Sequence, residues 1–293
     1  MAVRIAESAL RVLARSLRLL PLPLLLWLGR RLGSLAYWTL AGRRALAGEN
    51  LALAFGGERG SDELDRLCRG SFEHLGMTAV EVCASLFASP AAALSRVRVE
   101  GLHHLNAAMA RGKGVLLLTA HLGNWELLAA THGLSGHPLS IVVRPLDSSL
   151  LDRLVTRARE RSGAGVIRKH RALREVLDAL RRQRMVGILL DQNATRREGV
   201  FVPFFGRPAS TSKSLALLAL RSGAPVLPVF IHREADGSHR VVIEPEVPPP
   251  RTGDHRHDIV AYTAAFTRCV EDAVRRWPEQ WFWVHRRWRT RPV

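Results

Sequence analysis

A histidine and a carboxylate five positions apart are the residues of this chain best suited to acid–base chemistry. His121 and Glu126 stand in the segment Thr119-Ala-His-Leu-Gly-Asn-Trp-Glu126. A neutral imidazole can take a proton from a hydroxyl group, and a carboxylate on its second nitrogen fixes the tautomer and stabilises the imidazolium. The spacing predicts that His121 is a general base oriented by Glu126. The alternative is a structural histidine that caps the following helix while Glu126 is exposed.

No motif in the sequence supplies a nucleophile for a covalent acyl-enzyme. The Gly-x-Ser-x-Gly elbow does not occur, and the three scattered cysteines, Cys68, Cys83 and Cys269, lack an activating setting. A substrate hydroxyl activated by His121 is therefore the expected nucleophile. No metal site is expected, because His-Glu-x-x-His and paired cysteines do not occur and His132 is too far from His121 for a helical zinc pair.

Three charged residues are further candidates for the site. Arg144 and Asp191 each follow an apolar strand-like run, and Arg159 lies in an arginine-rich helical stretch. The planar guanidinium group suits a phosphate or a developing oxyanion, and Asp191 could anchor an arginine or a loop beside the site. The structural alternatives are a solvated helix face for the arginines of that stretch and a simple turn for Asp191.

An aromatic segment, Val202 to Ser212, is a candidate for binding an acyl chain. Phe204 and Phe205 could line an apolar slot, and Gly206, ahead of a helix start with free backbone amides, could help to hold an oxyanion or phosphate. The alternative is a loop plugged into the core by both phenylalanines. Asn124, which is turn-prone, is an additional candidate for substrate binding.

Helix geometry decides where His121 must lie. Each helical residue advances about 100° around the axis, so side chains five apart differ by about 140° and do not meet on one helix. His121 and Glu126 can approach only if His121 precedes the helix. The sequence permits this, because Val115 to Thr119 resembles a buried strand, Gly123 is turn-prone, and Trp125 to Ala130 can form a helix.

Apolar strands alternate with amphipathic helices after a helical start. The expected strands are Val97 to Val99, Val115 to Thr119, Leu139 to Val143, Val166 to Ile167, Val186 to Leu190, Val226 to His232 and Arg240 to Glu244. The alternation predicts an α/β fold with a mixed sheet flanked by helices. Ligand sites in such sheets lie at the carboxyl ends of the strands.

Residues 1–45 predict an apolar helical membrane anchor, followed by one α/β domain over residues 46–293. The uninterrupted apolar run Leu19 to Leu28 is shorter than the ~20 residues that span a bilayer, and Gly29-Arg30-Arg31 follows it instead of a cleavage site. An uncleaved, interfacial anchor is expected. The alternative is an amphipathic helix packed on the protein's own core.

The charge balance indicates an anionic partner. The chain has 43 Lys and Arg against 26 Asp and Glu, a net charge of +17. Phosphate-bearing lipid headgroups, an acidic carrier protein or nucleic acid would each satisfy this surplus. Charge alone does not choose among them.

Taken together, these segments resemble the lipid A biosynthesis acyltransferase family, the lauroyl and myristoyl transferases, within the glycerolipid acyltransferase group marked by His-x4-Asp/Glu. The resemblance covers most of the chain. It is carried by His121-Leu-Gly-Asn-Trp-Glu126, Arg144-Pro145, Thr156-Arg157-Ala158-Arg159, Asp191-Gln192, Pro203-Phe204-Phe205 and His285-Arg286-Arg287-Trp288-Arg289.

The resemblance implies transfer of a fatty acyl group from an acyl-carrier-protein thioester, or acyl-CoA, to a hydroxyl of a lipid A-type glycolipid precursor. His121 falls on the family's general base, Glu126 on its orienting carboxylate, Arg159 on a functionally important arginine, and Asp191 on the acid of an Asp-Gln pair. No cofactor or metal is implied. The implied partners are acidic acyl carrier protein, a membrane lipid acceptor and the cytoplasmic face of the bacterial inner membrane.

Other functions remain open at this point. The acceptor is in doubt because Leu146 to Ser149 replaces a segment that is often rich in asparagine, and Asn193 replaces a frequent acidic residue. Acylation of another lysophospholipid or glycolipid, or thioester hydrolysis, needs the same chemistry. A non-catalytic basic protein that binds membranes or nucleic acid would also explain the charge, but it has no use for a His–Glu pair and the sequence has no recognised nucleic-acid module.

Overall fold

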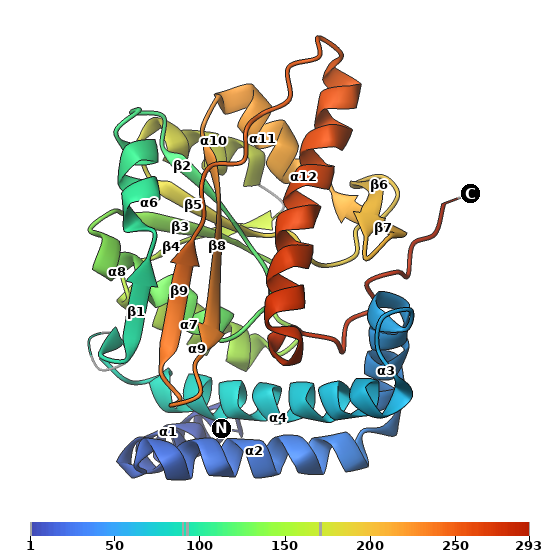
Figure 1. The fold of residues 1–293 in the computed structure, drawn as a ribbon. Coiled ribbons are helices and arrows are strands. Elements are labelled where there is room, and N and C mark those ends of the chain that lie inside the picture. The colour runs from blue at the N-terminus through green and yellow to red at the C-terminus, as the bar shows by residue number, and fades with distance from the viewer. Residues whose placement is uncertain (1, 90, 92–93, 170–171, 293) are drawn as a thin grey trace.

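The computed structural model describes residues 2–89, 91, 94–169 and 172–292. The described chain begins with helices α1 (Ala2–Leu19), α2 (Leu22–Thr39), α3 (Ala41–Phe55) and α4 (Ser61–Ser85). Strands and helices then alternate along the chain (Figure 1).

A seven-stranded sheet has the strand order β1-β9-β8-β2-β5-β3-β4. Strands β2, β3, β4, β5 and β8 all run in the same direction. Strand β9 is antiparallel to β8, and β1 is parallel to β9. The predicted mixed sheet is therefore confirmed, and each of the predicted strands lies in it. The strands are β1 (Val97–Glu100), β2 (Val115–Thr119), β3 (Leu139–Val143), β4 (Gly165–Arg168), β5 (Met185–Leu189), β8 (Val226–Arg233) and β9 (His239–Ile243).

Alternate side chains of the central strands enter two separate cores. Leu116 and Leu118 of β2 pack in a core with helices α10 (Ala172–Arg181), α11 (Ser214–Ser222) and α12 (His255–Arg276). Val115 of the same strand faces the opposite core with α6 (Leu102–Met109) and α7 (Trp125–Ala130). This period of two is what a strand covered on both faces requires, because successive side chains point to opposite sides. Two further α-helices are α8 (His132–Ser135) and α9 (Ser149–Arg161), and η2 (Pro278–Gln280) is a short 3-10 helix.

The N-terminal helices lie together beneath one end of the sheet, where α1 and α2 run beside α4 (Figure 1). Glycines allow the close approach of α2 and α4. A Cβ at Gly33 would lie 2.2 Å from the Phe72 carbonyl oxygen, and a Cβ at Gly76 would lie 2.2 Å from the Gly29 carbonyl oxygen. Helices α2 and α4 therefore pack closely against each other. Helix α4 also contacts the chain at the carboxyl ends of β2 and β8, where Glu81 accepts hydrogen bonds from Asn124 and Arg233.

Within the described residues, none of the helices combines the length and the apolar character needed to cross a bilayer. The predicted helical character of the N-terminal segment is confirmed by α1, α2 and the start of α3.

A hairpin that the sequence did not predict follows β5. Strands β6 (Gly199–Phe204) and β7 (Arg207–Ser212) pair antiparallel and pack on α12. The turn between them is formed by Phe205 and Gly206, which both have positive φ, as a type I′ hairpin turn requires.

Candidate active site

His121 lies in the short loop between strand β2 and helix α7, as the sequence predicted. The loop turns at Gly123, which has a φ of +61°, and a Cβ there would lie 2.0 Å from the Ile231 carbonyl oxygen. Only glycine fits this position without displacing the backbone.

The C-terminal segment fixes the backbone of this loop from the other side. The His121 carbonyl oxygen accepts a hydrogen bond from the backbone N–H of Phe282 at 3.0 Å, and the N–H of Gly123 donates to the Gln280 carbonyl oxygen at 2.9 Å. Residues far apart in sequence therefore hold His121 in one place.

Asp191 is the carboxylate that contacts the imidazole. Its Oδ1 lies 2.9 Å from His121 Nδ1, and its Oδ2 accepts from the His121 backbone N–H at 3.0 Å and from Trp281 Nε1 at 2.8 Å. Asp191 follows β5, and β5 pairs with β2 in a register that aligns Leu189 with Thr119. Neighbouring parallel strands thus bring the two residues together at one edge of the sheet.

Burial and charge set the protonation states of this pair. Burial alone would raise the pKa of Asp191, but the His121 charge and the hydrogen bonds from His121 and Trp281 lower it to about 2. Burial alone would lower the pKa of His121, but the Asp191 charge and hydrogen bond, with a smaller contribution from Glu126, raise it above 6.5. The His121 side chain is 23% exposed. Nδ1–H therefore donates to Asp191, and Nε2 is left to act as a base.

Glu126 takes a different partner from the predicted one. Its carboxylate accepts two hydrogen bonds from Arg159, at 3.0 Å from Nε and 2.7 Å from Nη2. The predicted orienting contact on His121 Nδ1 is thus made by Asp191 and not by Glu126. The physical reason is strand order: β5 lies next to β2, so the side chain after β5 reaches the ring, whereas Glu126 on α7 points toward α9.

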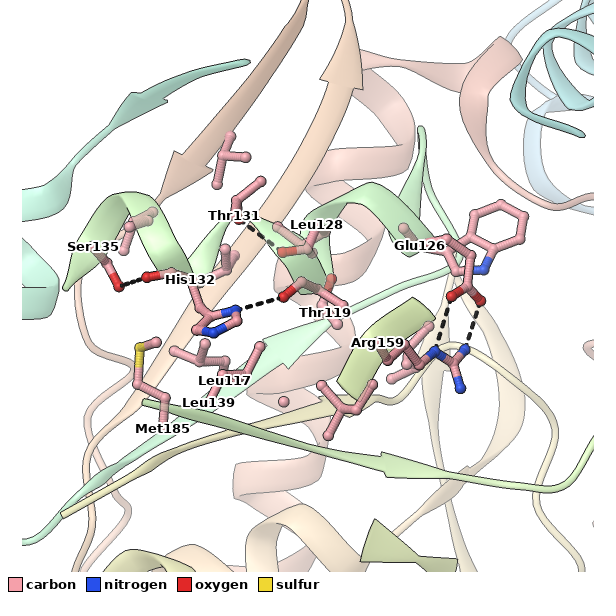
Figure 2. Close-up of a pocket in the computed structure, with 18 of the residues that line it drawn as sticks. Leu117, Thr119, Glu126, Leu128, Thr131, His132, Ser135, Leu139, Arg159 and Met185 are labelled. Carbon is pink, nitrogen blue, oxygen red and sulfur yellow. Dashed lines mark hydrogen bonds and ion pairs between the residues drawn. The ribbon is translucent and has the colours of Figure 1, made fainter. Parts of the chain in front are cut away.

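The Glu126–Arg159 pair lies at one end of an apolar cavity between the sheet and α7 (Figure 2). Met185 and Ser135 line the far end, and Thr119 and Trp125 are also among the lining residues. Its volume is about 90 Å³, room for several water-sized groups. The remaining lining is mainly aliphatic and includes Leu117, Leu128, Leu139, Ile141, Val143, Leu189, Val229 and Ile243.

A wider cleft of about 800 Å³ lies near His121. It is lined by α2, α4 and the C-terminal segment, and by the predicted substrate-binding residue Arg144. Gln192 lines this cleft, and its Nε2 lies 3.5 Å from His121 Nε2. The Phe282 ring also lines it and is centred 6.1 Å from the imidazole, whereas Trp125, 5.4 Å from the imidazole, lines the cavity. Residues around His121 thus belong to both spaces.

Asn124, predicted to bind substrate, is buried and links the loop to α4. Its Oδ1 accepts from the Leu127 backbone N–H at 3.1 Å, which caps α7, and its Nδ2 donates to Glu81 at 2.9 Å. Glu81 also accepts two hydrogen bonds from the buried Arg233. Burial would raise the pKa of Glu81, but Arg233 and His239 lower it to about 2, so this carboxylate is charged. Asn124 therefore positions the loop.

Substitutions at Asn124 separate capping from the link to Glu81. Serine also caps helices well, so Asn124→Ser loses mainly the contact with Glu81, and we expect it to cost about 1 kcal/mol in the free energy of unfolding. Asn124→Asp keeps a strong cap but places a carboxylate against the Glu81 carboxylate, and we expect a further loss of about 1–3 kcal/mol. Urea unfolding measures both. Equal stability of the two variants would contradict the role assigned to Glu81.

Phe204, Phe205 and Gly206 do not lie at either space, which corrects their predicted role in substrate binding. Both phenylalanines are at most 6% exposed and pack against Trp281, Trp283 and Phe55. Gly206 is in the exposed hairpin turn. The hairpin buries its aromatic end in the core with α12, which is the structural alternative that the sequence left open.

Two residues of the C-terminal segment lie near the site, although the sequence alone assigned neither of them a role in it. Trp281 donates to Asp191, and His285 Nε2 accepts from the Asn193 backbone N–H at 2.8 Å. Burial lowers the pKa of His285 to about 4, which matches a neutral ring that accepts this hydrogen bond. His285 lies in a segment that carries the family resemblance, but the sequence of that segment does not show which strands it meets.

Among residues 2–89, 91, 94–169 and 172–292, no group of three or more His, Cys, Asp or Glu is arranged to hold a metal ion. The site is instead built from a buried His–Asp pair, an apolar cavity and an adjoining cleft at the carboxyl ends of parallel strands.

Comparisons with known proteins identify the family of the chain. Residues 3–290 match the family model of the bacterial lipid A biosynthesis acyltransferases. The chain is 32% identical to the lipid A biosynthesis palmitoleoyltransferase of Escherichia coli K12, over 94% of this chain and 88% of that protein. It is also 32% identical to the lauroyltransferase of the same organism, over 93% and 88% of the two chains.

A more distant relative has a different acceptor in its name. The phosphatidylinositol mannoside acyltransferase of Mycobacterium tuberculosis H37Rv is 31% identical over 67% of this chain and 60% of its own length.

The fold, the site and these relatives define an acyltransferase that acts on glycolipids. The chain belongs to the bacterial lipid A biosynthesis acyltransferase family.

Proposed function

We propose that this enzyme transfers a fatty acyl chain from an acyl-carrier-protein thioester to a hydroxyl group of a lipid A-type glycolipid precursor, with His121 as general base and Asp191 as its orienting carboxylate. The observation that carries the proposal is the geometry of the pair, in which Nδ1 is held by a buried carboxylate and Nε2 has only a long contact of 3.5 Å with Gln192 Nε2. No other group is needed to activate a hydroxyl.

In the proposed reaction, the acceptor oxygen bonds to the thioester carbonyl carbon while its proton moves to His121 Nε2. The tetrahedral intermediate then collapses, the carbon–sulfur bond breaks, and the leaving thiolate takes the proton from Nε2. Arg159 donates to Glu126 through Nε and Nη2, so its Nη1 is the group that we assign to the developing oxyanion. Glu126 positions this guanidinium.

The apolar cavity is the proposed site of the acyl chain. Its aliphatic lining suits methylene groups, and the Glu126–Arg159 pair at one end would keep the polar thioester near His121. A long chain would require the side chains at the closed end to move, because the cavity holds only a few methylene-sized groups.

Gly187 of β5 lines this cavity and offers a way to narrow it. A Cβ there would lie 3.4 Å from Ile141 Cγ2 and 3.9 Å from Leu139 Cδ1, which is ordinary contact. We expect Gly187→Ala to fold at least as well as the parent chain. Alanine leaves the unfolded chain less conformational freedom than glycine does, and this stabilises the folded state by about 0.4–1 kcal/mol. It should favour shorter acyl donors. Competition between donors of different length, read by product mass, tests this; an unchanged preference would place the chain elsewhere.

An exposed apolar face on α1 and α2 supports association with a membrane surface. Its residues carry large side chains that are 44–85% exposed, namely Val12, Leu13, Leu19, Leu24, Trp27, Leu32, Leu35, Trp38 and Leu40 (the last at the end of α2). Arginines such as Arg18, Arg30 and Arg31 lie in the same segment. We propose that this face lies in the headgroup region of the cytoplasmic leaflet of the inner membrane, where apolar contact and anionic lipids both contribute. The surplus of positive charge would steer the acidic carrier protein.

One experiment tests the proposed function. The purified enzyme is given one acyl-carrier-protein thioester and, in turn, a lipid A-type precursor, a phosphatidylinositol mannoside and a lysophospholipid, and products are identified by mass. The proposal predicts acylation of the lipid A-type precursor. Preference for the mannoside would favour the acceptor of the mycobacterial relative. Free fatty acid alone would indicate a thioesterase, and no product from any acceptor would contradict an acyl-transfer function.

A further inference from the structure

The cleft beside His121 has one apolar wall and one basic wall. Helices α2 and α4 supply the apolar wall, which includes Leu32, Ala36, Phe72, Leu75 and Ala79. Four arginines, Arg43, Arg144, Arg286 and Arg289, are among the residues that line the remainder. No Asp or Glu is among the described residues that line the cleft. A space of this kind is complementary to an amphiphile with an anionic head.

These arginines lack the carboxylate partners that other arginines of the chain have. Arg159 is paired with Glu126, and Arg30, on α2, lies 4.0 Å from Glu73. In the part of the chain that the structure describes, none of the four cleft arginines forms an ion pair, and Arg43 reaches only the Val284 carbonyl oxygen at 3.5 Å. Guanidinium groups gathered without an anion repel one another, so a bound phosphate would be favoured.

The basic wall is held by buried contacts. Arg287, 1% exposed, donates to the Ser210 carbonyl oxygen at 2.9 Å and thereby fixes the segment that carries Arg286 and Arg289. The buried Asn50 donates to the carbonyl oxygens of Trp283 and His285 at 2.7 and 2.6 Å. The segment that carries Arg286 and Arg289 is therefore held in place before a ligand binds, which lowers the entropic cost of binding.

The cleft also lies next to the base. Gln192 lines it and its Nε2 lies 3.5 Å from His121 Nε2, and the Phe282 ring, which lines it too, is centred 6.1 Å from the imidazole. A ligand whose anionic group contacts the arginines can thus present a neighbouring hydroxyl to Nε2. The acyl-chain cavity shares no lining residue with the cleft, so the two substrates would occupy separate spaces.

We propose that this cleft binds the acyl acceptor and selects for a phosphate-bearing lipid headgroup, with Arg43, Arg144, Arg286 and Arg289 as the phosphate-binding residues and the α2–α4 wall as the surface for the adjoining acyl chains. This inference rests on the proposed function, because it assumes that the cleft ligand is the hydroxyl-bearing substrate. It adds the residues that determine specificity, and it predicts that the phosphate is recognised independently of the chemical step.

The test compares a phosphate-bearing glycolipid acceptor with the same lipid after removal of its phosphates by phosphatase, both in mixed micelles with a saturating acyl donor. We expect the double variant Arg286→Ala/Arg289→Ala to raise the acceptor KM about 10- to 100-fold for the phosphorylated lipid, with kcat within about threefold. Arg43→Ala and Arg144→Ala should each raise the acceptor KM for the phosphorylated lipid about five- to tenfold. The dephosphorylated lipid should have a high KM with the parent enzyme and change little in the variants.

Arg174→Ala is the matched control, because Arg174 is 93% exposed on α10 and remote from the cleft. Equal KM values for the two lipids with the parent enzyme would overturn the inference. An effect of the double variant on the donor KM alone would overturn it as well, since the arginines would then bind the carrier protein.

Binding of the same lipids to His121→Ala enzyme separates this inference from the proposed function. Preferential binding of the phosphorylated lipid without any acylation by the parent enzyme would leave the phosphate site standing and reject acyl transfer. Acylation by the parent enzyme without preferential binding of the phosphorylated lipid would support acyl transfer and reject the phosphate site.

Discussion

Replacing His121 by alanine should lower kcat for acyl transfer by about 10²- to 10⁴-fold, since that is the usual contribution of a general base. His121 is the group whose Nδ1 is fixed by Asp191 and whose Nε2 faces the cleft residue Gln192. The acceptor KM should change little, because the base acts on the reacting proton and the arginines of the cleft hold the lipid. Initial rates with mass detection of the product measure the loss.

His103→Ala is the control for this variant, because His103 is exposed on α6 and lines neither space. Circular dichroism and thermal unfolding should report a folded His121→Ala protein, since Asp191 keeps its hydrogen bonds from the backbone N–H of residue 121 and from Trp281. A folded His121→Ala enzyme with near-normal turnover would refute the role of His121 as the base.

Replacing Asp191 by asparagine should have an effect of similar size, a fall in kcat of about 10²- to 10⁴-fold. Asp191 accepts hydrogen bonds from three donors, two of them from His121. An amide has one oxygen and one NH2 group, so its NH2 group would face a donor. The favourable response is for Nδ1 to lose its proton and accept, which moves the proton to Nε2 and removes the base.

Glu126→Gln is the informative comparison for Asp191→Asn. It weakens a charged pair with Arg159 but leaves the tautomer of His121 intact, because Glu126 bonds to Arg159. We therefore expect a smaller loss of kcat than for Asp191→Asn. Equal rates for the Asp191→Asn variant and the parent enzyme would show that Asp191 is only structural.

The sequence predicts the strand–loop–helix placement of His121 because that placement is local. Strand composition, a turn-prone Gly123 and helix geometry all act within a dozen residues. The strands of the sheet are recognisable for the same reason. Each is a short apolar run between polar helices, and burial on both faces makes that pattern strong.

The sequence does not predict the partner of His121, because strand order is a tertiary property. Strand β5 lies beside β2, although β3 and β4 separate them along the chain, and this order brings Asp191 to the ring. The spacing favoured Glu126, which the fold turns toward Arg159 on α9. The position of Trp281 depends on where the C-terminal segment returns to the sheet, which has no local signal.

The same limit explains the aromatic hairpin. Phe204 and Phe205 look equally suitable for an acyl slot and for a core, because both environments are apolar. In the structure, the hairpin packs against α12 and the two phenylalanines contact the C-terminal tryptophans, so both side chains lie in the core. The residues that line the apolar cavity are ordinary aliphatic strand residues, which the sequence marks as core and not as a site.

The pH dependence of kcat/KM for the acceptor tests most directly whether His121 is a base governed by Asp191. The base must be neutral, so activity should fall as the pH drops through the pKa of His121, which Asp191 holds above 6.5. In Asp191→Asn the lost charge should move this acid limb to lower pH, in addition to the loss of rate, whereas Glu126→Gln should move it less. An acid limb that stays in place in Asp191→Asn but shifts in Glu126→Gln would contradict the His121–Asp191 pair.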